Sequence, residues 1–175
     1  MLFETPRLIA RFLNETDFSD IWRLQSDAEA MRYIRTPETD PEAVRERLQK
    51  WEQYAQKSPG LGVFAIEIKR DNAFAGYCTA RHVDYNPDTN EFEIGYALLP
   101  EFWGRGLVSE LVPHLAEYLF KVSGAPKIVA FTDPENIASQ KVLLKNGFRT
   151  IGRRFVYDTE NVEFELRRGR EVDDD

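Results

Sequence analysis

Three successive stretches in the middle of the chain have a hydrophobic period of two, which constrains the fold more than any other feature. They are GVFAIEIK (62–69), AFAGYCTARHV (73–83) and EFEIGYALL (91–99). A period of two is typical of β-strands that bury one face. The connections RDN and DYNPDTN are short and contain turn-forming residues, so the three strands are expected to pair as antiparallel neighbours.

The flanking segments predict the remaining elements of an α+β fold. Apolar residues at helical spacing predict four helices, at 17–28 with Asn14 or Thr16 as the cap, at 41–57 after Asp40, at 105–122, and from a cap at Asp133 and Pro134 to residue 146. Further strands are expected at 7–13, 127–132, 148–158 and 161–168. Together these elements predict a mixed, mostly antiparallel central sheet of about seven strands. The strand–helix–strand crossover at 91–132 creates one parallel pair in it.

Length, charge and cysteine content limit the class of protein. The 175 residues show no repeat or linker and predict one domain over 1–168, followed by an acidic tail at 169–175. The net charge of −7 comes without a basic stripe, so nucleic acid is not an expected partner. No apolar run reaches the roughly 18 residues that span a bilayer, and the N-terminus has no signal-peptide pattern. With Cys78 as the single cysteine, these features predict a cytoplasmic protein that does not bind membranes.

Two glycines flank an arginine where the third period-two stretch gives way to a helical pattern. The run EFWGRGLVSELV (101–112) places Gly104, Arg105 and Gly106 just before the first turn of that helix. Backbone N–H groups at a helix N-terminus have no intrahelical partner and bind anions, so the run predicts a phosphate site. The alternative is that the glycines only satisfy the dihedral angles of a tight turn. A Walker loop and a dinucleotide fingerprint are both excluded, because the GK[ST] ending is missing and Ser109 stands where a third glycine is needed.

Several motifs together resemble the GNAT superfamily of acetyl-CoA-dependent N-acetyltransferases, in the branch similar to bacterial ribosomal-protein N-terminal acetyltransferases. The motifs are the opening ETPRLIARFL, the run Glu93-Ile94-Gly95-Tyr96, Pro100, the segment from Phe102 to Gly106, Asn136 with Ser139, and Gly147-Phe148. They occur in the family's order and cover nearly the whole chain. The resemblance implies the GNAT fold, with two parallel strands that splay apart, and acetyl-CoA as a co-substrate.

The resemblance also implies where acetyl-CoA binds. The pyrophosphate is expected on the backbone of Gly104, Arg105, Gly106, Leu107, Val108 and Ser109. The pantetheine arm is expected between the strands at 91–99 and 127–132, with Asn136 as a contact and an N–H at Leu98 or Leu99 on the thioester oxygen. Tyr33 and Ile34 fall where the family builds its acceptor side. Val108 departs from the family, which usually has alanine or glycine there.

Two side chains are candidates for proton transfer. Along the strand at 91–99, Glu93 lies on the face opposite Phe92, Ile94 and Tyr96, with small neighbours at Gly95 and Ala97. The resemblance makes Glu93 the candidate base for the attacking amine; the alternative is a solvated strand glutamate. Ser139 takes the place of the tyrosine that many superfamily members use as the acid, and the alternative is a hydroxyl bonded to its own helix.

The predicted function is therefore an enzyme that transfers acetyl from acetyl-CoA to a primary amine by direct attack in a ternary complex. The amine is either a protein N-terminus or a small molecule. The alternative is a non-catalytic regulatory module that binds acetyl-CoA. No metal is expected, because His82 and His114 lack a partnering Cys or carboxylate pattern. The chain is expected to be a monomer or a homodimer, and Cys78 is expected to be a packing residue.

Overall fold

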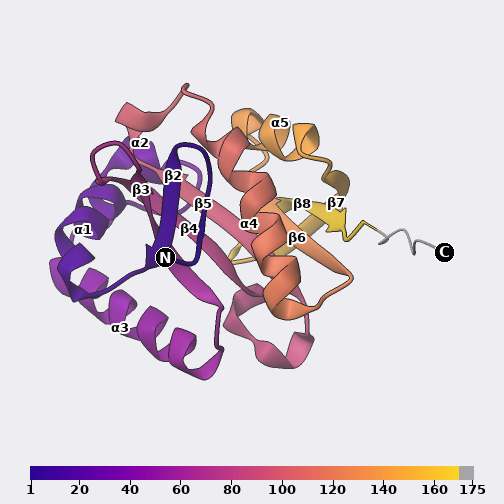
Figure 1. Cartoon of the computed structure of the whole chain (residues 1–175), viewed down its shortest axis with the longest axis horizontal. Helices are drawn as coiled ribbons and strands as arrows, with labels where there is room; N and C mark the ends of the chain where they lie inside the picture. Colours follow the sequence, from indigo (N-terminus) through magenta and orange to yellow (C-terminus); the bar gives the residue numbers. More distant parts are fainter. Residues whose placement is uncertain (170–175) are drawn as a thin grey trace.

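The structure is a computed structural model that describes residues 1–169, and its strands form one eight-stranded sheet with the order β1-β2-β3-β4-β5-β6-β8-β7. Of the predicted acidic tail, all but Gly169 lies outside the described residues. The strands are β1 (Phe3–Glu4), β2 (Leu8–Phe12), β3 (Gly62–Ile68), β4 (Ala73–His82), β5 (Phe92–Leu98), β6 (Lys127–Thr132), β7 (Arg149–Val156) and β8 (Thr159–Arg167) (Figure 1). Every neighbouring pair is antiparallel except β5 and β6.

Helices cover both faces of the sheet (Figure 1). They are α1 (Phe18–Ser26), α2 (Ala28–Met31), α3 (Pro41–Lys57), α4 (Leu107–Ser123) and α5 (Ile137–Lys145). The helices α4 and α5 pack on one face, while α1, α2 and α3 pack on the other. The expected α+β architecture with a mixed, mostly antiparallel sheet is confirmed.

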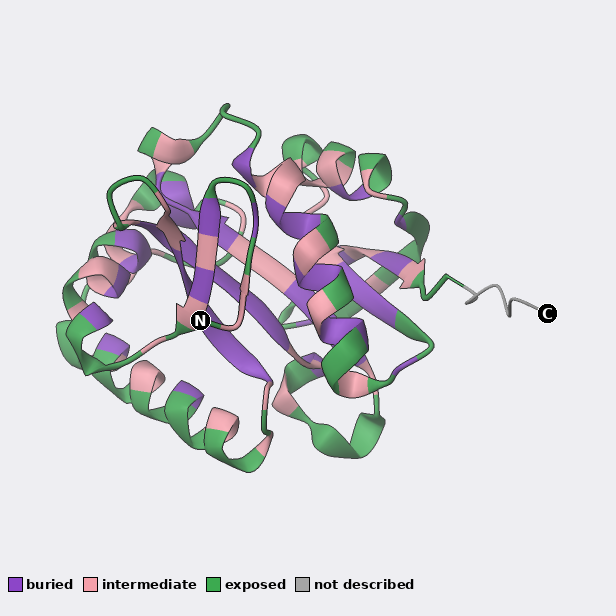
Figure 2. Ribbon diagram, in the orientation of Figure 1, coloured by how far each residue is buried: buried purple, intermediate pink, exposed green. Residues whose placement is uncertain are grey.

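The alternation along β5 divides the core into two layers. Ile94 and Leu98 belong to the apolar cluster that contains Leu111 and Leu115 of α4. Leu99, just beyond β5, belongs to the cluster on the opposite face, with α1 and α3. Figure 2 shows the central strands as the most continuously buried part of the fold. Cys78 on β4 is fully buried in the first cluster, which confirms its packing role, and burial raises the pKa of its thiol.

The parallel pair β5 and β6 opens toward one end. Its register contains the single pair Glu93 and Val129, whereas β4 and β5 pair from Gly76 and Leu98 to His82 and Phe92. Beyond Glu93 the backbone of β5 therefore keeps its partner on the β4 side and loses it on the β6 side. This V-shaped gap confirms the expected splay and has Glu93 at its apex.

Three local predictions differ from the structure. The helix expected at 17–28 is interrupted at Asp27, whose backbone is extended and whose side chain caps α2 by accepting from the N–H groups of Glu29 and Ala30. The strand β1 has only two residues, too few for a period to be detected. The last helix begins at Ile137, because Asn136 and not Asp133 or Pro134 provides its N-cap. The sheet therefore has eight strands instead of about seven, and the described chain has five α-helices instead of four.

Candidate active site

The loop before α4 has the backbone conformation of an anion-binding turn. Gly104 and Gly106 have φ values of +69° and +71°, in the left-handed region that favours glycine, and Gly106 is the N-cap of α4. A Cβ on Gly104 would meet no atom within 4 Å, so no protein atom occupies the space above it. The N–H groups of the first turn of α4 have no intrahelical acceptor and face this open approach. The turn therefore needs the dihedral angles of these glycines, and the space above Gly104 is open.

A cavity of about 420 Å³ extends from this loop along the C-terminal end of β5. Its walls come from α2, β5, the first turn of α4 and the first turns of α5. It brings together most of the predicted acetyl-CoA and acceptor residues, namely Tyr33, Ile34, Leu98, Gly104, Gly106, Leu107, Val108, Ser109, Asn136 and Ser139. Three stretches distant in sequence, 29–34, 96–109 and 136–142, thus meet at one surface, which is what a binding cleft requires.

Three predicted site residues do not line this cavity: Glu93, Leu99 and Arg105. The N–H of Leu99 donates to the carbonyl of Ala75 on β4 at 2.9 Å. Successive N–H groups of a strand point to opposite sides, so the N–H of Leu98 points away from β4 and into the gap beside β6. Of the two expected strand donors, Leu98 is therefore the one directed toward the cleft. Arg105 is exposed on the loop surface.

A hydroxyl pair lies in the wall of the cavity. The Tyr96 hydroxyl of β5 is 2.8 Å from Oγ of Ser139 on α5. Burial raises the pKa of Tyr96 to about 12, so the phenol keeps its proton at neutral pH. The Ser139 hydroxyl therefore pairs with β5 and not with a carbonyl of its own helix, and the Asn136 side chain accepts from the Ser139 N–H at 3.2 Å. The sequence analysis included Tyr96 only as the last residue of the motif Glu93-Ile94-Gly95-Tyr96. The signal for its contact with Ser139 was a hydroxyl on the otherwise apolar face of β5.

Glu93 lies outside the cavity wall, at the apex of the gap between β5 and β6. With about 3.3 Å per strand residue, it is roughly 16 Å from Leu98 along β5. Glu93 is only 4% exposed, so the solvated-glutamate interpretation is wrong. Burial raises the pKa of Glu93 even though Arg81 and Tyr157 favour its charged form. A buried carboxylate with a raised pKa is the type of group that serves as a general base.

The partners of Glu93 come from β4 and from the turn between β7 and β8, and the sequence analysis connected neither to it. Oε1 accepts from Nε of Arg81 and from the hydroxyl of Tyr157, both at 2.6 Å. The Arg81 guanidinium lies 3.9 Å from the ring centroid of Tyr85 and 5.2 Å from that of Tyr157. Among residues 1–169, no hydrogen bond engages Oε2. One oxygen is thus held in place while the other remains without a protein donor.

Residues 1–169 contain no group of three or more histidine, cysteine, aspartate or glutamate side chains placed to hold a metal ion. His82 pairs instead with the hydroxyl of Tyr54, 2.7 Å from its Nδ1. Within the same range, none of the helices combines the length and apolar composition needed to cross a membrane.

A splayed parallel pair that opens onto a glycine-flanked helix N-terminus defines an acyltransferase of the GNAT class. The sequence model of the Acetyltransferase (GNAT) domain matches residues 7–149, and the chain belongs to this family. The uncharacterized N-acetyltransferase YoaA of Bacillus subtilis (strain 168) is 29% identical over 160 residues, which are 89% of this chain and 88% of that protein.

Solved structures share the whole fold at low identity. RimL, a ribosomal L7/L12 alpha-N-protein acetyltransferase in complex with coenzyme A, superposes with a TM-score of 0.78 at 19% identity, covering 95% of this chain and 97% of that one. A spermidine N-acetyltransferase from Vibrio cholerae, in complex with CoA and spermine, gives a TM-score of 0.75 at 18% identity, with 91% and 95% covered. At these identities the likeness concerns the fold.

Proposed function

We propose that this GNAT protein transfers the acetyl group of acetyl-CoA to a primary amine by direct attack in a ternary complex. The observation that carries the proposal is the continuity of the glycine-flanked N-terminus of α4 with the cavity along β5. A pyrophosphate on the backbone from Gly104 to Ser109 would direct the pantetheine arm into the gap between β5 and β6. Val108 lines the cavity and also packs against the main apolar cluster, so its β-branched side chain is held partly away from the loop.

The chain supplies a group for each step at the acyl carbon. The N–H of Leu98 is directed toward the gap and would stabilise the negative charge on the thioester oxygen. The amine nitrogen forms a bond to the acetyl carbon and gives its proton to water, and Glu93, roughly 16 Å from Leu98 along β5, would receive that proton through a chain of water molecules. The carbon–sulfur bond then breaks with its electron pair on sulfur. Tyr96 would give its proton to that thiolate and recover one through Ser139.

The acceptor is assigned to a chemical class, the primary amines. Tyr33 and Ile34 line the cavity just after α2 and would contact the acceptor. Two of the solved structures with this fold point to amine acceptors. RimL is named for an alpha-N-protein substrate, and the Vibrio cholerae enzyme holds spermine. Their chemistry supports a primary amine here and leaves a protein N-terminus and a small molecule as two sources of the same group.

Two measurements test the proposal. Thermal unfolding with acetyl-CoA, against free adenosine as a control, tests binding; a ligand at a hundredfold excess over its Kd adds about 2.7 kcal/mol to stability. Release of free thiol from acetyl-CoA is then followed with a panel of peptide N-termini, polyamines and aminoglycosides. Stabilisation together with amine-dependent thiol release is expected. Stabilisation without thiol release would favour the alternative, a regulatory module that binds acetyl-CoA, and absence of both would refute the acetyl-CoA site.

A further inference from the structure

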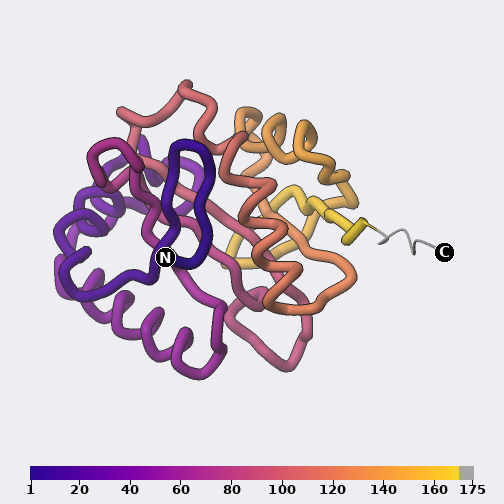
Figure 3. Tube along the Cα trace, viewed as in Figure 1, coloured from indigo at the N-terminus to yellow at the C-terminus, as the bar shows by residue number. Residues whose placement is uncertain are grey.

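We propose that Thr5, Arg7 and Glu110 form a clamp that positions the phosphate-binding loop, with Arg7 as the positioning residue. Thr5 and Arg7 flank the turn between β1 and β2, and Glu110 lies in the first turn of α4. Figure 3 shows this N-terminal hairpin running beside the start of α4. The inference rests on the proposed function, because it concerns how the same loop binds the phosphates of acetyl-CoA.

The Glu110 carboxylate connects the two segments. Oε1 accepts from the Thr5 hydroxyl and from the backbone N–H of Arg7, the latter at 2.8 Å, and Oε2 accepts from Nε of Arg7 at 2.6 Å. Thr5 is buried, and its Oγ1 also accepts from the N–H of Leu8 at 3.0 Å, so the clamp is anchored at the start of β2. Hydrogen bonds to charged groups are stronger than neutral ones, and here three converge on one carboxylate.

The same arginine also holds the other side of the loop. Nη1 of Arg7 donates to the carbonyl of Arg105 at 2.9 Å, and Nη2 lies 3.7 Å from the position that a Cβ on Gly106 would take. One guanidinium therefore bridges the residue before Gly106 and the helix turn after it. The two glycines have no side chains to pack, so the loop has few other restraints. A loop that is already ordered loses less conformational entropy when it binds a ligand.

Arg7 also balances the negative charge of Glu110 beside the loop. Glu110 is favoured by the positive end of the α4 dipole, but its negative charge would repel a phosphate bound to the same helix turn. Arg7 neutralises that charge at the loop. The Arg7 side chain is 49% exposed, and surface ion pairs of this kind contribute little to stability. Its contacts with the loop therefore point to ligand binding more than to folding.

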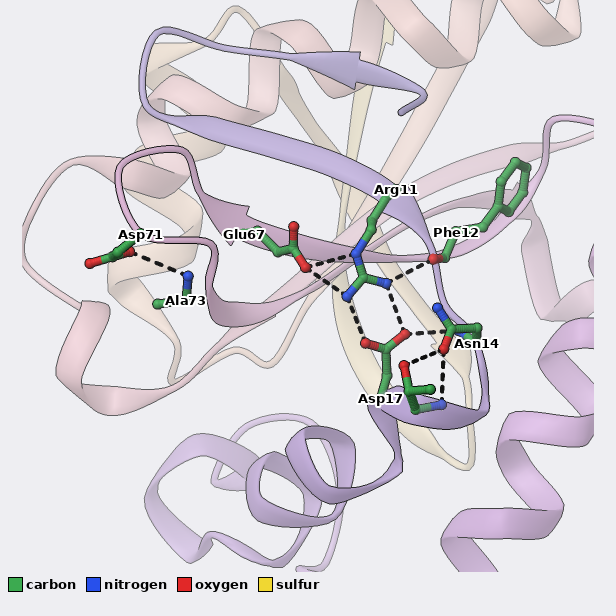
Figure 4. Close-up of polar contacts among 8 residues, drawn as sticks. Arg11, Phe12, Asn14, Asp17, Glu67, Asp71 and Ala73 are labelled. Atoms are coloured by element: carbon green, nitrogen blue, oxygen red, sulfur yellow. Dashed lines mark hydrogen bonds and ion pairs between the residues drawn. The ribbon is translucent and has the colours of Figure 1, made fainter.

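A control of the same chemistry exists four residues further along the chain. Arg11 of β2 donates to both carboxylate oxygens of Asp17, at 2.9 and 2.7 Å, and its Nε donates to Glu67 at 2.7 Å (Figure 4). This arginine links β2, β3 and the start of α1, and it does not line the cavity beside α4. Loss of Arg11 should therefore destabilise the fold without altering the phosphate-binding loop.

The test measures the affinity of the full chain for acetyl-CoA and for S-acetylpantetheine, which has no pyrophosphate, by isothermal titration calorimetry. Arg7→Ala is expected to weaken acetyl-CoA binding about tenfold and to leave S-acetylpantetheine binding unchanged. Adding Glu110→Gln to Arg7→Ala should recover part of the loss, because it removes the uncompensated charge. Arg7→Lys, which retains the charge but cannot span from Glu110 to the Arg105 carbonyl, should fall between Arg7→Ala and wild type. Arg11→Ala should lower the melting temperature and keep the wild-type Kd for acetyl-CoA.

The outcomes separate the clamp from the proposed function. Wild-type affinity in Arg7→Ala and Arg7→Lys would overturn the clamp, as would an equal loss of affinity in Arg11→Ala. If Arg7→Ala does not fold, Arg7→Lys decides the question by itself. A wild-type chain that binds no acetyl-CoA would instead refute the proposed function, and the clamp with it.

Discussion

The Glu93 carboxylate is subject to two opposing influences. Burial favours its neutral form, while the hydrogen-bonded Arg81 and Tyr157 favour its charged form, and burial prevails, so its pKa lies above the ordinary value. A base must be deprotonated to accept a proton. We therefore expect kcat/KM for the amine to fall as pH drops through this raised pKa, and we expect Glu93→Gln to lower kcat by about 10²-fold or more. Thiol release measured as a function of pH checks both effects.

Glu91 provides the matched control for Glu93. It precedes β5, two residues before Glu93, and its carboxylate pairs with Arg154 at 2.9 Å, yet it is more exposed and lies farther from the open end of the gap. Glu91→Gln should keep kcat near the wild-type value. If the two variants lose activity equally, or if Glu93→Gln retains wild-type kcat, Glu93 is an ion-pair partner of Arg81 and not the base.

Tyr96 is expected to protonate the leaving thiolate. Tyr96→Phe removes the hydroxyl that lies 2.8 Å from Ser139 and changes little else, so kcat should fall by about 10²-fold with an unchanged KM for acetyl-CoA. Tyr118→Phe is the control, because that hydroxyl donates to the Gly60 carbonyl at 2.7 Å, away from the cavity. Steady-state thiol release distinguishes them. Equal kcat values for Tyr96→Phe and wild type would remove Tyr96 from the mechanism.

At the scale of the elements, Gly76 of β4 leaves no room for a side chain against β5. Its φ is +153°, and a Cβ there would stand 2.0 Å from the Ala97 carbonyl oxygen and 2.8 Å from Cα of Leu98. Gly76→Ala must therefore displace β5 at the residue whose N–H is directed toward the gap. Besides the strain of about 1–3 kcal/mol for a non-glycine residue in such a conformation, this displacement should lower both the free energy of unfolding and kcat.

Gly152 on β7 is the control that distinguishes backbone strain from displacement of a neighbouring strand. Its φ is +149°, close to that of Gly76, but a Cβ there would meet nothing within 4 Å. Gly152→Ala should therefore show the conformational cost alone, with unchanged kcat. Urea denaturation and thiol release on both variants measure the two effects. If Gly76→Ala is no more harmful than Gly152→Ala, the close approach of β4 does not constrain the site.

The sequence predicted elements well where a period repeats and poorly where structure depends on a few atoms. The strands β3, β4 and β5 follow from their period of two, whereas β1 and α2 are too short to have one. The start of α5 was predicted wrongly, because the cap was expected at Asp133 and Pro134, whereas the Asn136 side chain accepts from the first turn. The loop residues followed from the helix N-terminus and the resemblance. The burial of Glu93 could not be predicted, because Tyr157 reaches it from a hairpin turn 64 residues away in sequence.

For the whole molecule, the carboxylates determine how stability changes in acid. Five have a pKa below the ordinary value, namely Glu38, Asp71, Glu91, Glu110 and Glu165, while Asp20 and Glu93 have a raised pKa. A lowered pKa gives stability that is present above the unfolded-state pKa and is lost as pH falls through the folded-state pKa. A raised pKa has the opposite sign. As the pH drops below about 4, the five carboxylates with a lowered pKa become protonated. The free energy of unfolding should therefore decrease over this pH range.

Glu165 should account for a measurable part of that acid loss. The ammonium of Lys127, which donates to Glu165 at 2.9 Å, lowers the pKa of this carboxylate against the effect of burial, and Arg167 donates to it at 2.8 Å. Because the Lys127 contact joins β6 to β8, Glu165→Gln should lower stability at pH 7 and flatten the decline between about pH 5 and about pH 2.5. The control is Glu160→Gln, whose exposed pair with Arg153 lies near the end of the β7–β8 hairpin. Urea denaturation across this pH range measures both, and a Glu165→Gln curve parallel to that of the wild type would show that acid stability is determined elsewhere in the sheet.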